Sequence, residues 1–148
     1  MTKTMWPFGV FLFLVGTTCS REDDHAERPV GGSDHIFGVN APRITIEELS
    51  GFITHERVVF VDVRSREDFE SQHIPGAVSI PLSHLWFRWD EIPAADRVIT
   101  YCACQGDVSS ARAAVALLDR GLKNVAALQG GITQWIANGG KTEGKSSD

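Results

Sequence analysis

Cysteine is scarce in this chain of 148 residues, which has three cysteines, at positions 19, 102 and 104. Three thiols are too few for the disulfide framework of a small secreted scaffold. Clustered positive charge is also missing: 14 lysines and arginines face 19 aspartates and glutamates, and the formal net charge is −5. Because phosphate backbones are bound by clustered cations, the composition argues against a nucleic-acid partner. The length allows one domain.

No apolar stretch reaches the length of about 20 residues that a membrane-spanning helix requires. The first 19 residues do contain a short apolar run at 8–15, with Lys3 before it and small residues after it. This order is typical of a secretory signal peptide. Cys19 follows the small residues, as does the lipidated cysteine that begins mature bacterial lipoproteins. Residues 1–19 therefore predict export to the periplasm or cell envelope, with Cys19 as the lipid anchor to the membrane.

Two alternatives for this segment stay open, namely plain cleavage near Cys19 and an uncleaved hydrophobic anchor. Residues 20–42 are polar, charged and glycine-rich and show no helical or strand periodicity, so they are predicted to form a linker. Residues 43–142 carry a regular pattern and are predicted to form the folded domain. Residues 143–148 are polar and are predicted to form a flexible tail.

Strand-like and helix-like segments alternate through the domain. Short apolar runs rich in β-branched residues begin at positions 44, 58, 77, 98 and 125, and helices are predicted at 66–72, 82–91, 109–120 and from 131. This alternation indicates right-handed βαβ units and a parallel sheet, in which ligands bind at the carboxyl ends of the strands. Cys102 and Cys104 directly follow a strand and precede a helix, so the chemistry is expected there.

A thiolate at such a strand-to-helix turn has specific chemistry. Backbone N–H groups point into the turn and the helix amino terminus adds partial positive charge. A cysteine placed there has a lowered pKa and becomes nucleophilic. The loop residues that would surround the sulfur are Ala103, Gln105, Gly106, Asp107, Val108 and Ser109.

Four motifs in this order resemble those of the rhodanese family. They are Asp62-Val63-Arg64, His73-Ile74-Pro75-Gly76-Ala77, the Tyr101-Cys102 loop before an alanine-rich helix, and Gly130-Gly131 followed by Trp135. The resemblance implies an α/β fold with a five-stranded parallel sheet flanked by helices on both faces. It also implies a sulfurtransferase or sulfane-sulfur carrier that forms a cysteine persulfide on the Cys102/Cys104 loop. The expected partners are a small sulfur donor and a thiol or cyanide-like acceptor; no metal or other cofactor is implied, and a monomer is expected.

The two loop cysteines compete for the role of nucleophile. Counting from the strand favours Cys102, whereas counting back from the helix favours Cys104; we take Cys102 as the expected nucleophile. Asp62 and Arg64 are expected to support neighbouring loops as a strand-end pair. Arg112 lies in the first turn of the helix after the loop, where it could face the sulfur or solvent.

The charge of the loop disfavours thiosulfate as the sulfur donor. Thiosulfate-using members of the family often carry a cation in this loop, whereas here the loop has no lysine or arginine and contains Asp107. A negative charge beside the site repels a dianion. A donor other than thiosulfate is therefore expected.

Other functions are compatible with parts of this pattern. Cys-x-Cys could act as a thiol–disulfide redox module, and the missing loop cation is compatible with a catalytically silent rhodanese-like binding domain. Phosphatases of this fold need an arginine after a Cys and five further residues, but here Val108 and Ser110 stand at the corresponding positions. Sulfur transfer is the leading hypothesis.

Export can be tested by fractionating cells that express the full-length chain or its Cys19→Ala variant. We expect wild type in the membrane fraction, shortened to begin at Cys19, because each buried methylene of the attached acyl chains contributes about 0.8 kcal/mol. The variant should leave the membrane. Full-length wild type in the soluble cytoplasmic fraction would contradict export, and unchanged membrane association of the variant would contradict the lipid anchor alone.

Overall fold

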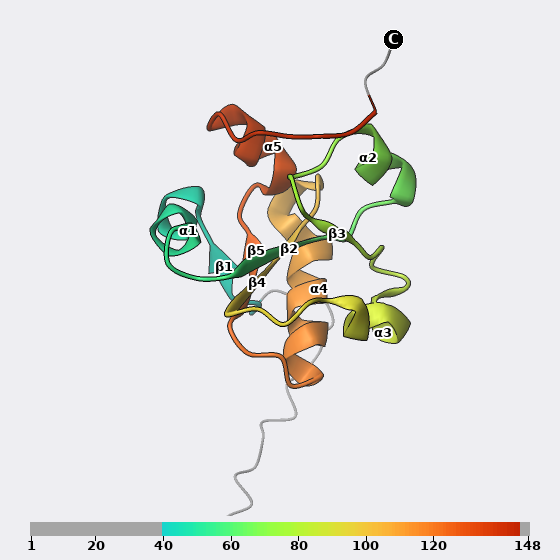
Figure 1. The fold of residues 1–148 in the computed structure, drawn as a ribbon. Coiled ribbons are helices and arrows are strands. Elements are labelled where there is room, and N and C mark those ends of the chain that lie inside the picture. Colours follow the sequence, from blue (N-terminus) through green and yellow to red (C-terminus); the bar gives the residue numbers. More distant parts are fainter. Residues whose placement is uncertain (1–39, 146–148) are drawn as a thin grey trace, which may run out of the picture.

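Parallel strands form the centre of the computed structural model, which describes residues 40–145 (Figure 1). The strands are β1 (Arg43–Ile44), β2 (Val58–Asp62), β3 (Val78–Ser79), β4 (Arg97–Tyr101) and β5 (Val125–Leu128). The helices are α1 (Ile46–Ile53), α2 (Arg66–Ser71), α3 (Leu85–Arg88), α4 (Val108–Asp119) and α5 (Gly131–Ala137). Two 3₁₀ turns, η2 (Trp89–Glu91) and η3 (Gln105–Asp107), follow α3 and precede α4.

The strand order is β1-β5-β4-β2-β3, and every neighbouring pair is parallel. β4 lies at the centre, where it pairs with the whole length of β2 and with β5. Both faces of such a sheet are buried, which is why these strands are continuous apolar runs. The predicted fold, a five-stranded parallel sheet with helices, is confirmed. Asp62 pairs with Tyr101, so β2 and β4 end level with each other just before Cys102.

Successive strand residues point alternately into two hydrophobic cores, one on each face of the sheet. Phe60 and Ile99 belong to the core that includes residues of α1 and α5. Val61 and Val98 belong to the core that includes residues of α3 and α4. The helix α4 contributes small residues, Ala111, Ala113 and Ala114, which are fully buried. Their size lets the helix that follows the cysteine loop lie close against the sheet.

The helix predicted between Pro81 and Pro93 is divided into two short pieces. A turn comes first, in which the N–H of His84 donates to the carbonyl of Pro81. The one-turn helix α3 then tightens into η2, and Ile92 is extended, with ψ of 120°. A residue before proline disfavours the helical conformation, so Pro93 ends the segment.

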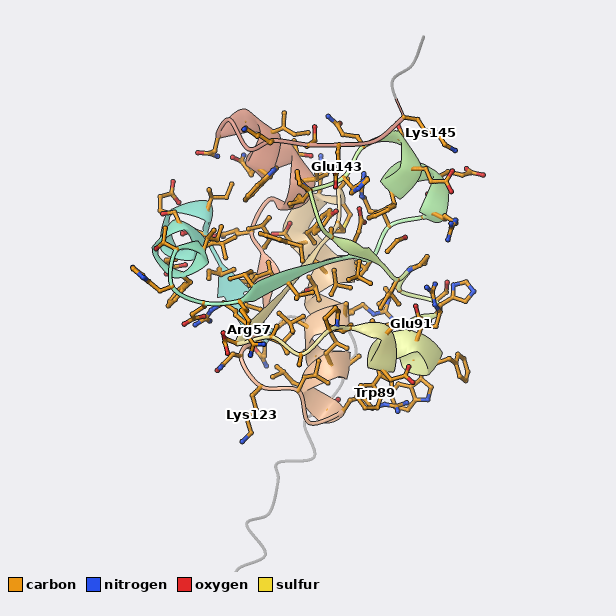
Figure 2. All side chains as sticks on the ribbon, viewed as in Figure 1. Arg57, Trp89, Glu91, Lys123, Glu143 and Lys145 are labelled. Atoms are coloured by element: carbon orange, nitrogen blue, oxygen red, sulfur yellow. The ribbon has the colours of Figure 1, made fainter. Side chains whose placement is uncertain are left out.

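The C-terminal residues lie against α2 and the loop that follows it. Glu143 and His73 form an antiparallel bridge, with N–H to carbonyl distances of 2.8 and 2.9 Å. The Nζ of Lys145 lies 2.6 Å from a carboxylate oxygen of Glu70. Figure 2 shows Glu143 and Lys145 on the segment that passes α2. The sequence places both residues in a flexible tail; in the structure, hydrogen bonds to a segment 70 or more residues earlier hold them in place.

The signal peptide, Cys19 and the linker up to residue 39 lie outside the residues that the structure describes. Their assignment stays a prediction. Between residues 40 and 145, no helix is long and apolar enough to cross a membrane.

A buried ion pair joins the end of β2 to the loop after α2. The Asp62 side chain is fully buried, and its carboxylate accepts hydrogen bonds from the backbone N–H and from the guanidinium of Arg64, with Nη2 at 2.6 Å. The same Nη2 donates to the carbonyl of Gln72 at 2.6 Å. The pair thus closes the segment that contains α2, as a structural clamp at the carboxyl edge of the sheet.

Replacing Arg64 tests this clamp. Arg64→Ala leaves the charge of Asp62 buried without its partner, so we expect the free energy of unfolding to fall by roughly 3 kcal/mol. Arg57→Ala is the matched control, because it removes an exposed pair with Asp96 whose side chains are 72% and 48% exposed. Exposed pairs contribute little. Urea denaturation of both variants measures the difference, and equal losses would contradict the structural role of the clamp.

Candidate active site

The cysteine loop joins β4 to α4 at the carboxyl edge of the sheet. Cys102 follows the last residue of β4, and η3 leads into α4. The hydroxyl of Thr100 donates to the carbonyl of Ser110 at 2.8 Å, which fixes the first turn of α4 on the strand. The amino end of a 12-residue helix therefore lies at the thiols, with unpaired N–H groups and partial positive charge.

The two thiols of this loop have different surroundings. Cys102 is 2% exposed and belongs to the hydrophobic core, whereas Cys104 is exposed. Their Sγ atoms lie 2.6 Å apart. The Oγ of Ser110 lies 3.6 Å from the Sγ of Cys102. The loop thus places one thiol in the core directly beside one that reaches solvent.

Hydrogen bonds and burial shift the pKa values of the two thiols in opposite directions. Partial burial acts to raise the pKa of Cys104, but hydrogen bonds from the Cys102 thiol, from the N–H and hydroxyl of Ser109 and from its own N–H hold it below its usual value. Burial raises the pKa of Cys102, and the Cys104 side chain raises it further, against weaker opposition from Ser110. Cys104 is therefore the more acidic thiol of the pair.

The preference for Cys102 as nucleophile does not agree with this geometry. The strand register correctly places Cys102 at the end of β4, but a residue in that register points into the core. A buried thiol with a raised pKa is a poor nucleophile toward a molecule in solution. Counting back from the helix, which favours Cys104, agrees with the exposure and the pKa of that residue.

A cavity of about 240 Å³ opens beside Cys104. It is formed by the cysteine loop and by residues at the start of α5, namely Ala103, Cys104, Gln105, Gly106, Asp107, Gly130, Thr133 and Gln134. Gly106 and Asp107 have φ of 71° and 57°, the left-handed conformation that glycine adopts freely and aspartate tolerates. These two residues curl the loop around the cavity.

Asp107 is a buried carboxylate in the wall of this cavity. Its residue is 5% exposed, and its Oδ2 accepts a hydrogen bond from the N–H of Gly130 at 3.0 Å. Its Oδ1 has no hydrogen-bond partner within residues 40–145. No lysine or arginine is among the described residues that line the cavity. The cavity is therefore acidic, as the loop sequence predicts.

A larger cavity, of about 500 Å³, lies at the opposite edge of the sheet. It is lined by residues near the amino ends of β4 and β5 and by α1, including Phe52, Arg97 and Val125. No cysteine is among the described residues that line it, so the size of this cavity does not make it the site of cysteine chemistry.

Three contributors to the site were missed in the sequence prediction, namely the hydroxyl of Ser110 and the roles of Gly130 and Gly131. The N–H of Ile132 donates to the carbonyl of Cys102 at 3.0 Å, and a Cβ on Gly131 would overlap that carbonyl oxygen. The paired serines in the first turn of the alanine-rich helix and the paired glycines where α5 begins were the available sequence signals.

The remaining predicted residues surround the thiols at different distances. Val108 is exposed at the start of α4, and Ser109 is partly buried and bonds the sulfur of Cys104. Arg112 is exposed on α4 and does not line the cavity. The guanidinium of Arg64 lies 5.8 Å over the ring of Tyr101, so the pair that it forms with Asp62 lies beside the residue that precedes Cys102.

Residues 45–138 match the rhodanese-like domain family. The match covers more than half of the chain, and the chain therefore belongs to this family. Its relatives include sulfurtransferases and sulfur carriers at modest identity.

Three relatives show the range of this similarity. The uncharacterized protein YqhL of Bacillus subtilis is 40% identical over 91 residues, which are 62% of this chain and 68% of YqhL. The putative sulfur carrier protein YrkF of the same organism is 33% identical over 103 residues, 69% of this chain and 53% of YrkF. A sulfurtransferase of Allochromatium vinosum is 32% identical over 84 residues, 57% of this chain and 77% of that protein. The chain thus spans about half the length of YrkF.

Solved structures share the fold. A rhodanese-related protein from Thermoplasma volcanium aligns with a TM-score of 0.60 at 26% identity, covering 70% of this chain and 99% of that one. A protein from Bacillus halodurans aligns with a TM-score of 0.61 at 30% identity, covering 74% and 82%. The rhodanese-like fold of the chain is therefore shown by sequence and structure together.

Alkylation across pH tests the assignment of the two thiols. Because the pKa of Cys104 is lowered and that of Cys102 is raised, we expect iodoacetamide to modify Cys104 first and at a pH below that of an ordinary cysteine. Ser109→Ala removes one hydrogen bond to the Cys104 thiolate and should shift its profile to higher pH, whereas Ser83→Ala, an exposed serine on another loop, should not. Peptide mass mapping measures both, and faster modification of Cys102 would contradict the assignment.

Proposed function

We propose that this protein is a sulfurtransferase or sulfane-sulfur carrier that holds a persulfide on Cys104. The observation that carries the proposal is an exposed thiol with a lowered pKa, at the amino end of α4, opening into a cavity. Membership of the rhodanese-like family supports it.

The loading step is a thiol exchange on sulfur. The Cys104 thiolate attacks the outer sulfur of a donor R–S–S⁻, a new S–S bond forms on Cys104, and R–S⁻ leaves with the electron pair of the broken bond. The lowered pKa of Cys104 enlarges the fraction of thiolate at a given pH, and this favours the attack.

The same groups that stabilise the thiolate are placed to stabilise the persulfide anion. Ser109 offers its N–H and hydroxyl to the sulfur of Cys104, and the amino end of α4 adds partial positive charge. Charge-assisted hydrogen bonds of this kind are stronger than neutral ones. The cavity then gives the outer sulfur room to meet an acceptor such as a thiol or cyanide.

The acidic wall of the cavity argues for a donor other than thiosulfate. Thiosulfate is a dianion, and the carboxylate of Asp107 lines the cavity with one oxygen that has no hydrogen-bond partner among the described residues. No cation in the lining offsets this charge. A monoanionic or neutral persulfide meets less repulsion and is the donor class that we favour.

A second candidate function, thiol–disulfide exchange without sulfur transfer, is favoured by the 2.6 Å between the two Sγ atoms. In that case the two cysteines would cycle between dithiol and disulfide, and no sulfur would be added to the protein.

We also propose, from the sequence of residues 1–19, that the protein acts outside the cytoplasm on a lipid anchor at Cys19. Its sulfur donor and acceptor would then be molecules of the periplasm or cell envelope. The domain itself is proposed to act as a monomer.

Sulfur loading and transfer test the proposal. Full-length wild type, Cys104→Ser and Cys19→Ser are each given an organic persulfide or thiosulfate, then cyanide, and both the intact mass and thiocyanate are measured. We expect wild type and Cys19→Ser to pass sulfur to cyanide and form thiocyanate, faster from the organic persulfide than from thiosulfate. Cys104→Ser should fall to background, because it lacks the nucleophile.

The outcomes separate the candidate functions. Transfer by Cys104→Ser at the wild-type rate would contradict the role of Cys104. A wild-type protein that forms a disulfide but neither passes sulfur to cyanide nor releases it as sulfide would favour the exchange function instead.

A further inference from the structure

We propose that Cys102 is a resolving thiol that expels the sulfur held on Cys104 as hydrosulfide and forms a Cys102–Cys104 disulfide. This inference rests on the proposed function and extends it: the protein would release reduced sulfur by itself, without a separate acceptor, and would then need a dithiol reductant to start again.

The positions of the two sulfurs carry the inference. The Sγ of Cys102 lies 2.6 Å from the Sγ of Cys104, so the attacking sulfur is already in contact with the sulfur that it would attack. Cys102 lies on the core side of Cys104, and the cavity lies on the solvent side. A sulfur added to Cys104 would extend into the cavity, because the core side is filled.

This placement aligns the three sulfurs for displacement. Attack on a disulfide or persulfide sulfur proceeds with the entering and leaving sulfurs on opposite sides of the sulfur attacked. Cys102 approaches the inner sulfur from the core, and the outer sulfur leaves toward solvent. Because both sulfurs are held in this geometry, the attack is intramolecular and needs no encounter between two molecules. The effective concentration of an attacking group held in this way can reach about 10⁵ M.

The step is balanced in atoms and electrons. Cys102–SH and Cys104–S–S⁻ give a Cys102–S–S–Cys104 disulfide and HS⁻. The bond between Cys104 and the outer sulfur breaks, and its electron pair leaves with the outer sulfur. The proton of Cys102 passes to that leaving sulfur. The two thiols are oxidised to a disulfide and the sulfane sulfur is reduced to sulfide, after which an external dithiol, small or protein-borne, restores both cysteines.

The surroundings of Cys102 fit an attacking thiol better than a structural one. The Oγ of Ser110 lies 3.6 Å from its sulfur, and Ser110 is itself fixed because its hydroxyl donates to the carbonyl of Asp107 at 3.0 Å. Nucleophilicity rises with the pKa of a thiol, so a buried cysteine is the stronger attacker once its proton is removed. Burial also keeps oxidants and donors in solution from reaching Cys102 before Cys104 is loaded.

A single-turnover experiment tests the inference on the full-length chain. Wild type, Cys102→Ser, Cys102→Ala and the control Cys19→Ser are loaded with an organic persulfide, freed of donor, and left without acceptor. Released sulfide is measured over time, and acid-quenched samples are mapped for added sulfur and disulfide. Two replacements of Cys102 are used because the residue is buried; circular dichroism confirms that each is folded.

We expect wild type and Cys19→Ser to release one sulfide for each loaded protein and to gain the Cys102–Cys104 disulfide. Both Cys102 variants should keep the added sulfur on Cys104 and release none. Dithiothreitol should return wild type to the dithiol and allow a second round. Sulfide release from the Cys102 variants at the wild-type rate, or stable added sulfur on wild type, would overturn the inference.

The Cys102 variants also distinguish a failure of this inference from a failure of the proposed function on which it rests. Added sulfur that stays on Cys104 in these variants supports the persulfide whatever wild type does. If neither the variants nor wild type ever carry added sulfur, the proposed function itself fails and the resolving role fails with it.

Discussion

Gly131 lies against the carbonyl of Cys102 so closely that any side chain there would overlap the oxygen. This approach lets the N–H of Ile132 reach the same carbonyl, at 3.0 Å. The carboxylate of Asp107 makes a second link, to the N–H of Gly130. Two loops that are far apart in the sequence are thereby fixed together at the carboxyl edge of the sheet. Cys102 and Asp107 stand at the two ends of the cysteine loop. Because both ends are fixed at this junction, the directions of the two thiols are fixed as well.

Once the loop is fixed, the difference in solvent exposure between the two thiols decides their chemistry. Both lie at the amino end of α4, and the helix favours a negative charge on either. Burial opposes that charge more strongly at Cys102, which is 2% exposed, than at Cys104. The pKa is therefore lowered at the exposed Cys104 and raised at the buried Cys102, within three residues of the chain.

The sequence alone predicts the sheet and the place of the site, and it fails on features made by distant contacts. Residues 58–61 and 98–101 are continuous runs of β-branched and aromatic residues, and the alanine-rich helix after the cysteines has a clear apolar face, so local patterns suffice for the α/β fold. Which thiol is buried depends on the path of a short loop, and that path depends on a hydrogen bond between Asp107 and Gly130, 23 positions apart. The bridge from Glu143 to His73 depends on the finished fold in the same way.

The C-terminal segment is held in a defined position on the domain, and this position determines where a further domain could be attached. The rhodanese-like match ends at residue 138, but the chain continues past α2, where Lys145 contacts Glu70 through both its backbone and its side chain. These contacts bring the end of the described chain to the edge of the sheet that carries the cysteine loop. A module fused after Lys145 would therefore begin from a fixed point on the side of the domain that carries the two thiols.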